Sequence, residues 1–88
     1  MPRYFFDVLD GGRLARDAFG VDLPDMADVR DHAIGLLPDI ARDELPDGEQ
    51  HDFACEVRND AGRIIYRAML TLRAGAVDEP ARPADGNS

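Results

Sequence analysis

The chain has 88 residues and a formal net charge of −8, from 18 acidic and 10 basic side chains, and 44% of its residues are hydrophobic. These values are typical of one small globular domain. The chain contains no Lys, which excludes a Schiff-base lysine and a phosphate-loop lysine, and its only Ser is Ser88 at the last position, where we expect no catalytic triad. The single cysteine, Cys55, excludes an internal disulfide and a paired-cysteine metal site.

The first quarter of the chain predicts a β-hairpin. Side chains alternate between two faces in residues 4–9, and the segment is rich in aromatic residues, as is typical of a strand. Residues 10–12 have the sequence Asp-Gly-Gly, which favours a tight turn, so residues 13–16 form the returning strand. Residues 17–20 predict a second turn, and we expect at most a brief pairing of residues 21–23 before the helix.

The middle of the chain predicts one amphipathic helix. Asp25 follows Pro24 and can accept hydrogen bonds from the first-turn N–H groups, which indicates a helix start. Six apolar residues recur at helical spacing and form one stripe: Met26, Val29, Ala33, Leu36, Leu37 and Ile40. Pro38 removes a backbone donor inside this pattern, so we expect a kink there rather than a break. Residues 46–48, Pro-Asp-Gly, predict the end of the helix.

The rest of the chain predicts a second hairpin and a tail. After a polar loop, Phe53, Cys55 and Val57 alternate with more polar residues, a turn follows at residues 59–62, and residues 64–72 form the last strand. The fold class is therefore α+β in the order ββ-α-ββ, with an antiparallel sheet of two hairpins and one kinked helix packed on one face. We expect one domain over residues 1–73 and a disordered tail over residues 74–88.

Six short segments resemble a family of short bacterial proteins that carries a domain-of-unknown-function label. They are Met1-Pro2-Arg3-Tyr4-Phe5-Phe6, Asp10-Gly11-Gly12, residues 17–20, Leu23-Pro24-Asp25, Asp43-Glu44-Leu45 and Asp60-Ala61-Gly62-Arg63. The resemblance covers nearly all of residues 1–66. It implies the same architecture, and it implies no catalytic residue because no activity is assigned to the family.

The uncovered face of the sheet is the candidate functional surface. One helix covers only one face, and alternation places Phe5, Leu9, Ile65 and Met69 on the other. An exposed apolar patch of this kind marks an interaction site. We therefore interpret the protein as a non-enzymatic interaction module that forms a homodimer or binds another protein through this surface. The alternative is that residues 14–23 fold back over that face.

The competing hypothesis is a small metal-dependent or acid/base enzyme. It would use one of the two histidines with neighbouring carboxylates: His32 with Asp28 and with Asp39 or Asp43, or His51 with Glu49 and Asp52. A His and an Asp four residues apart on a helix more often form a surface ion pair, and a polar loop is more often only solvated. We therefore expect no catalytic residue, cofactor or metal, and we expect Cys55 to be an inert core thiol.

The charge distribution bears on partners and location. Residues 26–52 carry a net charge of −6, whereas residues 53–73 carry +2. A net acidic domain disfavours binding to nucleic acid, which leaves an acidic nucleic-acid mimic as a third hypothesis. The first apolar run is cut short at Asp7, and no stretch has the ~18 apolar residues that span a bilayer. We expect no membrane contact and a cytoplasmic location.

Overall fold

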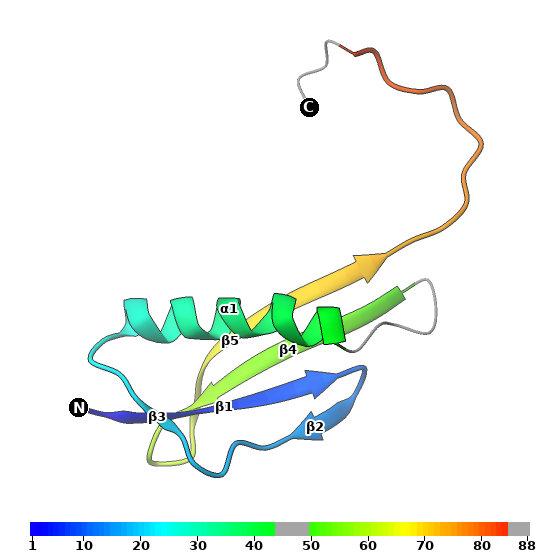
Figure 1. Ribbon diagram of the computed structural model, residues 1–88. Helices are drawn as coiled ribbons and strands as arrows, with labels where there is room; N and C mark the ends of the chain where they lie inside the picture. Colours follow the sequence, from blue (N-terminus) through cyan, green and yellow to red (C-terminus); the bar gives the residue numbers. More distant parts are fainter. Residues whose placement is uncertain (44–49, 85–88) are drawn as a thin grey trace.

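The computed structural model of the protein describes residues 1–43 and 50–84. Its elements in chain order are β1 (Arg3–Asp10), β2 (Arg13–Ala15), β3 (Val21–Asp22), α1 (Met26–Asp43), β4 (Gln50–Arg58) and β5 (Ile64–Arg73). All strand pairs are antiparallel, in the order β2-β1-β4-β5, and β3 pairs with β1 as well. The helix α1 lies along one face of this sheet (Figure 1). The predicted α+β class, with one helix and an antiparallel sheet, is confirmed.

The strand count and several strand boundaries differ from the prediction. The segment expected to pair only briefly is a fifth strand, β3, so α1 follows three strands rather than two. The strand β2 ends at Ala15, one residue earlier than predicted. The strand β4 begins at Gln50, inside the segment predicted as a loop, because its polar first residues pair through their backbone with the end of β5. The predicted helix end at residues 46–48 lies outside the described residues.

The turn between β1 and β2 has the predicted chemistry. Gly11 and Gly12 adopt φ angles of 59° and 98°, in the left-handed region that favours glycine. The Gly11 N–H donates to the carbonyl of Asp52 over 3.0 Å. This turn is therefore also tied to the first residues of β4.

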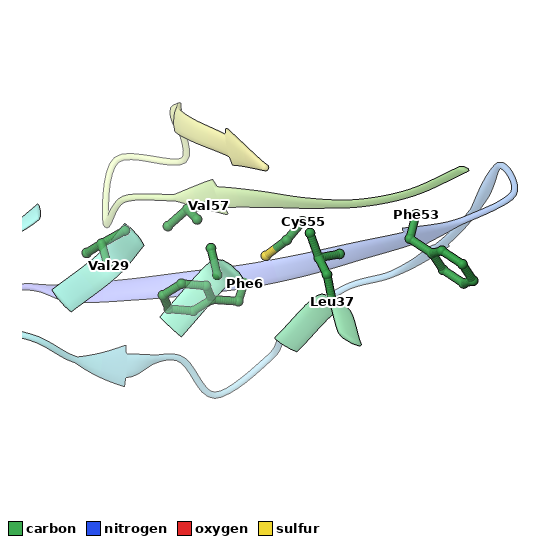
Figure 2. Close-up of a cluster of buried hydrophobic side chains, with 7 residues drawn as sticks. Phe6, Val29, Leu37, Phe53, Cys55 and Val57 are labelled. Carbon is green, nitrogen blue, oxygen red and sulfur yellow. The ribbon is translucent and has the colours of Figure 1, made fainter. Parts of the chain in front are cut away.

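The core lies between α1 and the two central strands. Figure 2 shows buried residues of α1, among them Val29 and Leu37, facing the side chains of Phe6, Phe53, Cys55 and Val57. Most of the predicted helical stripe therefore packs on the sheet, with Leu36 and Ile40 at its margin. Met26 is an exception, because it is exposed at the first helical position. Cys55 is fully buried in this cluster, as alternation predicted.

The helix begins as predicted and continues past its proline. The N–H of Asp28 donates to the carboxylate of Asp25 over 3.0 Å, which satisfies one of the free first-turn donors. The helix runs through Pro38 as a single element, so the segment is not broken in two; the kink stays a prediction. Within residues 1–43 and 50–84, no helix is both long and apolar enough to cross a bilayer.

The segment after β5 contains no helix or strand over residues 74–84. Every one of these residues is exposed, and the segment runs away from the sheet and α1 (Figure 1). Its disorder stays a prediction.

Candidate functional site

The face of the sheet opposite α1, here called the open face, carries the predicted interaction residues of β1 and β5. Alternation with the core residues places on it Phe5, Asp7, Leu9, Ala54, Glu56, Arg58, Arg67 and Met69. Leu9 pairs with Ala54, and Ala54 pairs with Met69, so these three form one apolar row across β1, β4 and β5. Phe5 and Ile65 lie toward the other end of the same strands, beside the register irregularity between Val57 and Arg58.

The four predicted residues differ in how much of their surface reaches solvent. Met69 is 63% exposed and Ile65 is 37% exposed. Phe5 and Leu9 are only half-buried, and Ala54 between Leu9 and Met69 is buried. The apolar surface available to a partner is therefore concentrated on β5.

Paired charges separate the two apolar ends of the open face. Glu56 and Arg67 are cross-strand partners, and their side chains form an ion pair at 2.8 Å. Arg58 forms a second ion pair with Asp7, with Nε 2.6 Å from Oδ2. The Leu9–Ala54–Met69 row is therefore divided from Phe5 by a band of four charged side chains that neutralise one another.

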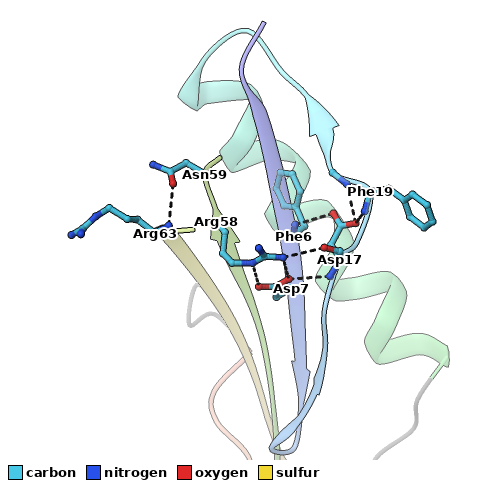
Figure 3. A network of polar contacts seen from close by, with 8 residues as sticks. Phe6, Asp7, Asp17, Phe19, Arg58, Asn59 and Arg63 are labelled. Atoms are coloured by element: carbon cyan, nitrogen blue, oxygen red, sulfur yellow. Dashed lines mark hydrogen bonds and ion pairs between the residues drawn. The ribbon is translucent and has the colours of Figure 1, made fainter. Parts of the chain in front are cut away.

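Asp7 is the centre of a polar network at the edge of β1 (Figure 3). Its side chain is 6% exposed, and its carboxylate accepts two hydrogen bonds from the Arg58 guanidinium and a third from the N–H of Asp17 over 3.0 Å. Arg58 also donates to the Asp17 carbonyl over 3.0 Å, and its guanidinium carbon lies 4.9 Å from the centre of the Phe5 ring. The network therefore joins β1, β4 and the segment after β2.

The network shifts the pKa values of its members in the directions that keep it charged. Burial alone raises the pKa of Asp7, but the hydrogen bonds from Arg58 and the Asp17 N–H, with the Arg58 charge, hold it below its ordinary 3.8. Burial likewise raises the pKa of Asp17, and the N–H groups of Gly20, Phe6 and Phe19 outweigh it and lower that pKa. The hydrogen bond to Asp7 raises the pKa of Arg58.

The segment after β2 borders the open face at Phe5 and does not extend to β5. Phe19 is 82% exposed, and its ring points away from the sheet (Figure 3). Gly20, with φ at 77°, is the residue that approaches Phe5, because a Cβ there would lie 3.0 Å from the Phe5 ring. Val21 packs instead against the core cluster. Among the described residues, this segment therefore contacts the open face at Phe5, Asp7 and Arg58.

The last strand exposes apolar side chains on both faces of the sheet. On the open face these include Met69, and on the α1 side they include Leu70 and Leu72. A shallow groove between α1 and β5 is lined by Ile34, Leu37, Pro38, Tyr66, Ala68 and Leu70, among others. Ile34 is itself exposed, so the helix leaves this outer part of the sheet incompletely covered.

The two histidines have different surroundings, and the described residues show no hydrogen bond or ion pair between either histidine and its predicted carboxylates, of which Glu49 lies outside the described residues. The His32 ring packs on Phe6, with ring centres 4.4 Å apart. His51 lies in β4, where its Nε2 is 2.5 Å from Oδ1 of Asp10 and its ring lies 4.6 Å from that of Phe53. Among the described residues, no three His, Cys, Asp or Glu side chains are grouped closely enough to hold a metal ion.

Cys55 has the surroundings of an unreactive thiol. Burial, and to a lesser extent the negative charges of Asp7, Asp17 and Glu56, together raise the pKa of this thiol to about 11. The thiolate, which is the nucleophilic form, is therefore disfavoured in the folded protein.

Sequence reasoning missed the roles of Asp7 and Asp10. Asp7 is a lone carboxylate inside an aromatic strand, and a charged residue among core residues is seldom buried without a partner. Its position in the sequence therefore indicated that a charged partner exists. Its partner, Arg58, is 51 residues away in the sequence. Asp10 was assigned only to the turn, and its partner His51 is 41 residues away.

Comparison with known proteins gives one match. A family model described as "Domain of unknown function (DUF6894)" matches residues 3–71, which span β1 through most of β5. No curated protein and no solved structure matches the chain.

Proposed function

The chain belongs to the DUF6894 family, which has no assigned activity, and from that premise we propose that it is a non-enzymatic protein-interaction module that self-associates through its sheet. The proposed surface comprises Phe5, Leu9, Ile65 and Met69. Its most exposed part lies on β5, where Met69 is 63% exposed on the face opposite α1. That exposure is the observation that carries the proposal, since clustered exposed apolar side chains mark interaction surfaces.

A second copy of the chain is the partner that the charges favour. The chain as a whole carries −8, so two copies repel each other over most of their surface. On the open face, however, Asp7 is paired with Arg58 and Glu56 with Arg67. Because this surface is locally neutral, an identical surface can approach it without facing a like charge.

The test is the mass of the protein in solution. Sedimentation equilibrium at micromolar concentrations should give twice the 9.7 kDa mass of the chain. Met69→Asp should raise the dimer dissociation constant about tenfold or more, because a lost apolar contact and a desolvated charge together cost more than ~1.4 kcal/mol of binding. A 9.7 kDa monomer for the unmodified protein throughout this range would contradict self-association.

Val77→Asp is the matched control. Val77 is 77% exposed, lies outside the sheet, and receives the same change from an apolar to an acidic side chain. It should leave the dissociation constant unchanged. Circular dichroism of both variants should equal that of the unmodified protein, and an equal weakening by both variants would show that net charge, not the sheet, controls association.

A further inference from the structure

We infer that the second copy joins at the outer edge of β5, where the two β5 strands pair antiparallel about a two-fold axis and unite both sheets. This inference rests on the proposed self-association and narrows its surface to the β5 residues Ile65 and Met69, because Phe5 and Leu9 lie on β1, two strands away from the joined edge. The two edges of the sheet differ in how far they are protected against pairing with a further strand.

The β1 side of the sheet is protected against further pairing. The strands β2 and β3 occupy parts of the edge of β1, and between them the Asp17 carboxylate accepts the N–H of Phe6 over 3.1 Å. Two short strands and an inserted carboxylate are devices by which proteins prevent edge-to-edge pairing.

The β5 side has none of these devices. The strand is ten residues long, and within the described part of the chain no strand pairs with its outer side. It contains no Pro and no Lys, and its register irregularity lies only at its start, opposite Val57 and Arg58. Residues 74–84 lead away from this edge and do not cover it (Figure 1). A long, straight, apolar edge of this kind is a template for another strand.

The edge is long enough for a stable dimer. Antiparallel pairing along nearly the whole of this ten-residue strand would form about eight to ten backbone hydrogen bonds, which is close to the number found in a typical protein–protein interface. The side chains of both strands would add apolar contacts on both faces of the joined sheet.

The two faces of β5 are self-complementary in this arrangement. In antiparallel pairing about a two-fold axis, residues on one face of a strand meet residues on the same face of the other. On the α1 side these residues are Tyr66, Ala68, Leu70 and Leu72, all apolar. Leu70 and Leu72 are exposed in the single chain, and Ile34 of α1 is exposed above the adjacent groove. A continued sheet would join the two apolar rows on the face that carries both helices.

Charge selects the position of the axis. With Met69 on the axis, Arg67 lies opposite Thr71 of the partner subunit and Arg73 lies opposite the partner's Ile65, so no two arginines meet. With Leu70 on the axis, Arg67 would lie opposite the partner's Arg73, and with Ala68 on the axis, Arg73 would lie opposite the partner's Arg63. Arg67 is also neutralised within its own chain by Glu56. The geometry therefore points to a two-fold axis at Met69.

The test is disulfide formation by single introduced cysteines. On the axis, the Cα atoms of the paired residues are about 4.5–5.5 Å apart, which suits a disulfide. Met69→Cys should therefore oxidise in air to a covalent dimer within the non-covalent dimer. Leu70 lies one residue from the axis, on the α1 side, so the two copies of this residue are about 8 Å apart in the dimer. Leu70→Cys should therefore be joined by a thiol cross-linker with a span of ~8 Å. The native Cys55 is buried and adds no background.

Leu9→Cys is the matched control, because Leu9 lies in the same cross-strand row as Met69. In the edge-paired dimer five strand spacings, about 24 Å, separate the two copies of this residue, and no cross-link forms. If Leu9→Cys is linked while Leu70→Cys is not, the open faces stack on each other and edge pairing is wrong, whereas self-association stands. If sedimentation shows only monomer and no variant is linked, both proposals are wrong.

Discussion

Asp7 is the residue whose surroundings depend most on the fold. A carboxylate on a strand between two aromatic residues and a valine is destabilising if buried alone, because an unpaired buried charge costs several kcal/mol. The structure compensates this cost with Arg58 and with the N–H of Asp17. The pair therefore holds the segment after β2 in place rather than forming a reactive site.

The lowered pKa of Asp7 gives a prediction for stability against pH. A carboxyl whose pKa is lower in the folded state stabilises that state above its unfolded value of about 3.8, and this contribution is lost as the pH falls below it. Asp7→Asn should therefore lower the free energy of unfolding at pH 7 by about 1–3 kcal/mol, the value of hydrogen bonds to a charged group. Urea denaturation between pH 3 and pH 7 should show a flatter pH dependence for the variant.

Asp31→Asn is the control for this experiment. Asp31 forms only an exposed ion pair with Arg30, so its removal should change the free energy of unfolding by less than ~0.5 kcal/mol. Equal effects of the two variants would mean that the Asp7 network contributes no more than a surface ion pair.

At the scale of elements, α1 covers only part of β5. The helix α1 lies closest to β4 and β5, its buried stripe also faces Phe6 of β1, and the groove beside β5 is lined by Ile34 and Pro38 on the helix side. The sequence periodicity correctly predicted which helical face is buried. It did not indicate that the helix lies off-centre on the sheet, because that depends on the strand order.

Pro38 gives a prediction for the stability of α1. Proline has no backbone N–H, so Pro38 removes one hydrogen-bond donor from the helix interior and destabilises the helix. Pro38→Ala would restore this hydrogen bond. The unfolded chain of the variant is more flexible, however, and this offsets part of the gain in stability. The free energy of unfolding should rise by about 2 kcal/mol, measured by urea denaturation.

Asp39→Ala, an exposed change at the next position, is the control and should have an effect within ~0.5 kcal/mol. A decrease in stability for Pro38→Ala would show that the ring's contacts in the groove toward β5 outweigh the missing hydrogen bond.

At the scale of the whole molecule, the charge of −8 is unevenly distributed. The segment that contains α1 carries most of it, whereas the β4–β5 hairpin is mildly basic and the residues after β5 carry −2. Repulsion between copies therefore originates chiefly on the helix side. The edge of β5 carries only Arg67 and Arg73 as charged side chains, so the strand itself adds no acidic residue to this repulsion.

Truncation after Arg73 tests whether the tail contributes to the domain. Residues 74–84 are exposed throughout, so their removal should change the free energy of unfolding by less than ~0.5 kcal/mol. The dissociation constant of the proposed dimer should also stay unchanged. Urea denaturation and sedimentation of the truncated protein measure both quantities, and a loss of either would mean that the tail packs on its own chain or on a partner.

Much of the local structure follows from the sequence alone. Alternation places Phe6, Cys55 and Val57 in the core, and the glycines of the first turn set the hairpin, because strand period and turn chemistry involve only residues close in the sequence. The α+β class follows from the same local signals. The short strand β3 was harder to predict, because two residues have too little pattern to separate a strand from a turn.

Only the tertiary structure decided what surrounds the charged residues and which edge of the sheet is open. The Asp7–Arg58 and Asp10–His51 pairs join residues 51 and 41 positions apart, and which strands become neighbours is not contained in any local period. The same strand order puts β5 at the margin of the sheet and divides the apolar open face with paired charges. The sequence by itself determined which residues face inward or outward, whereas the order and register of the strands determined which of the outward ones a partner can reach.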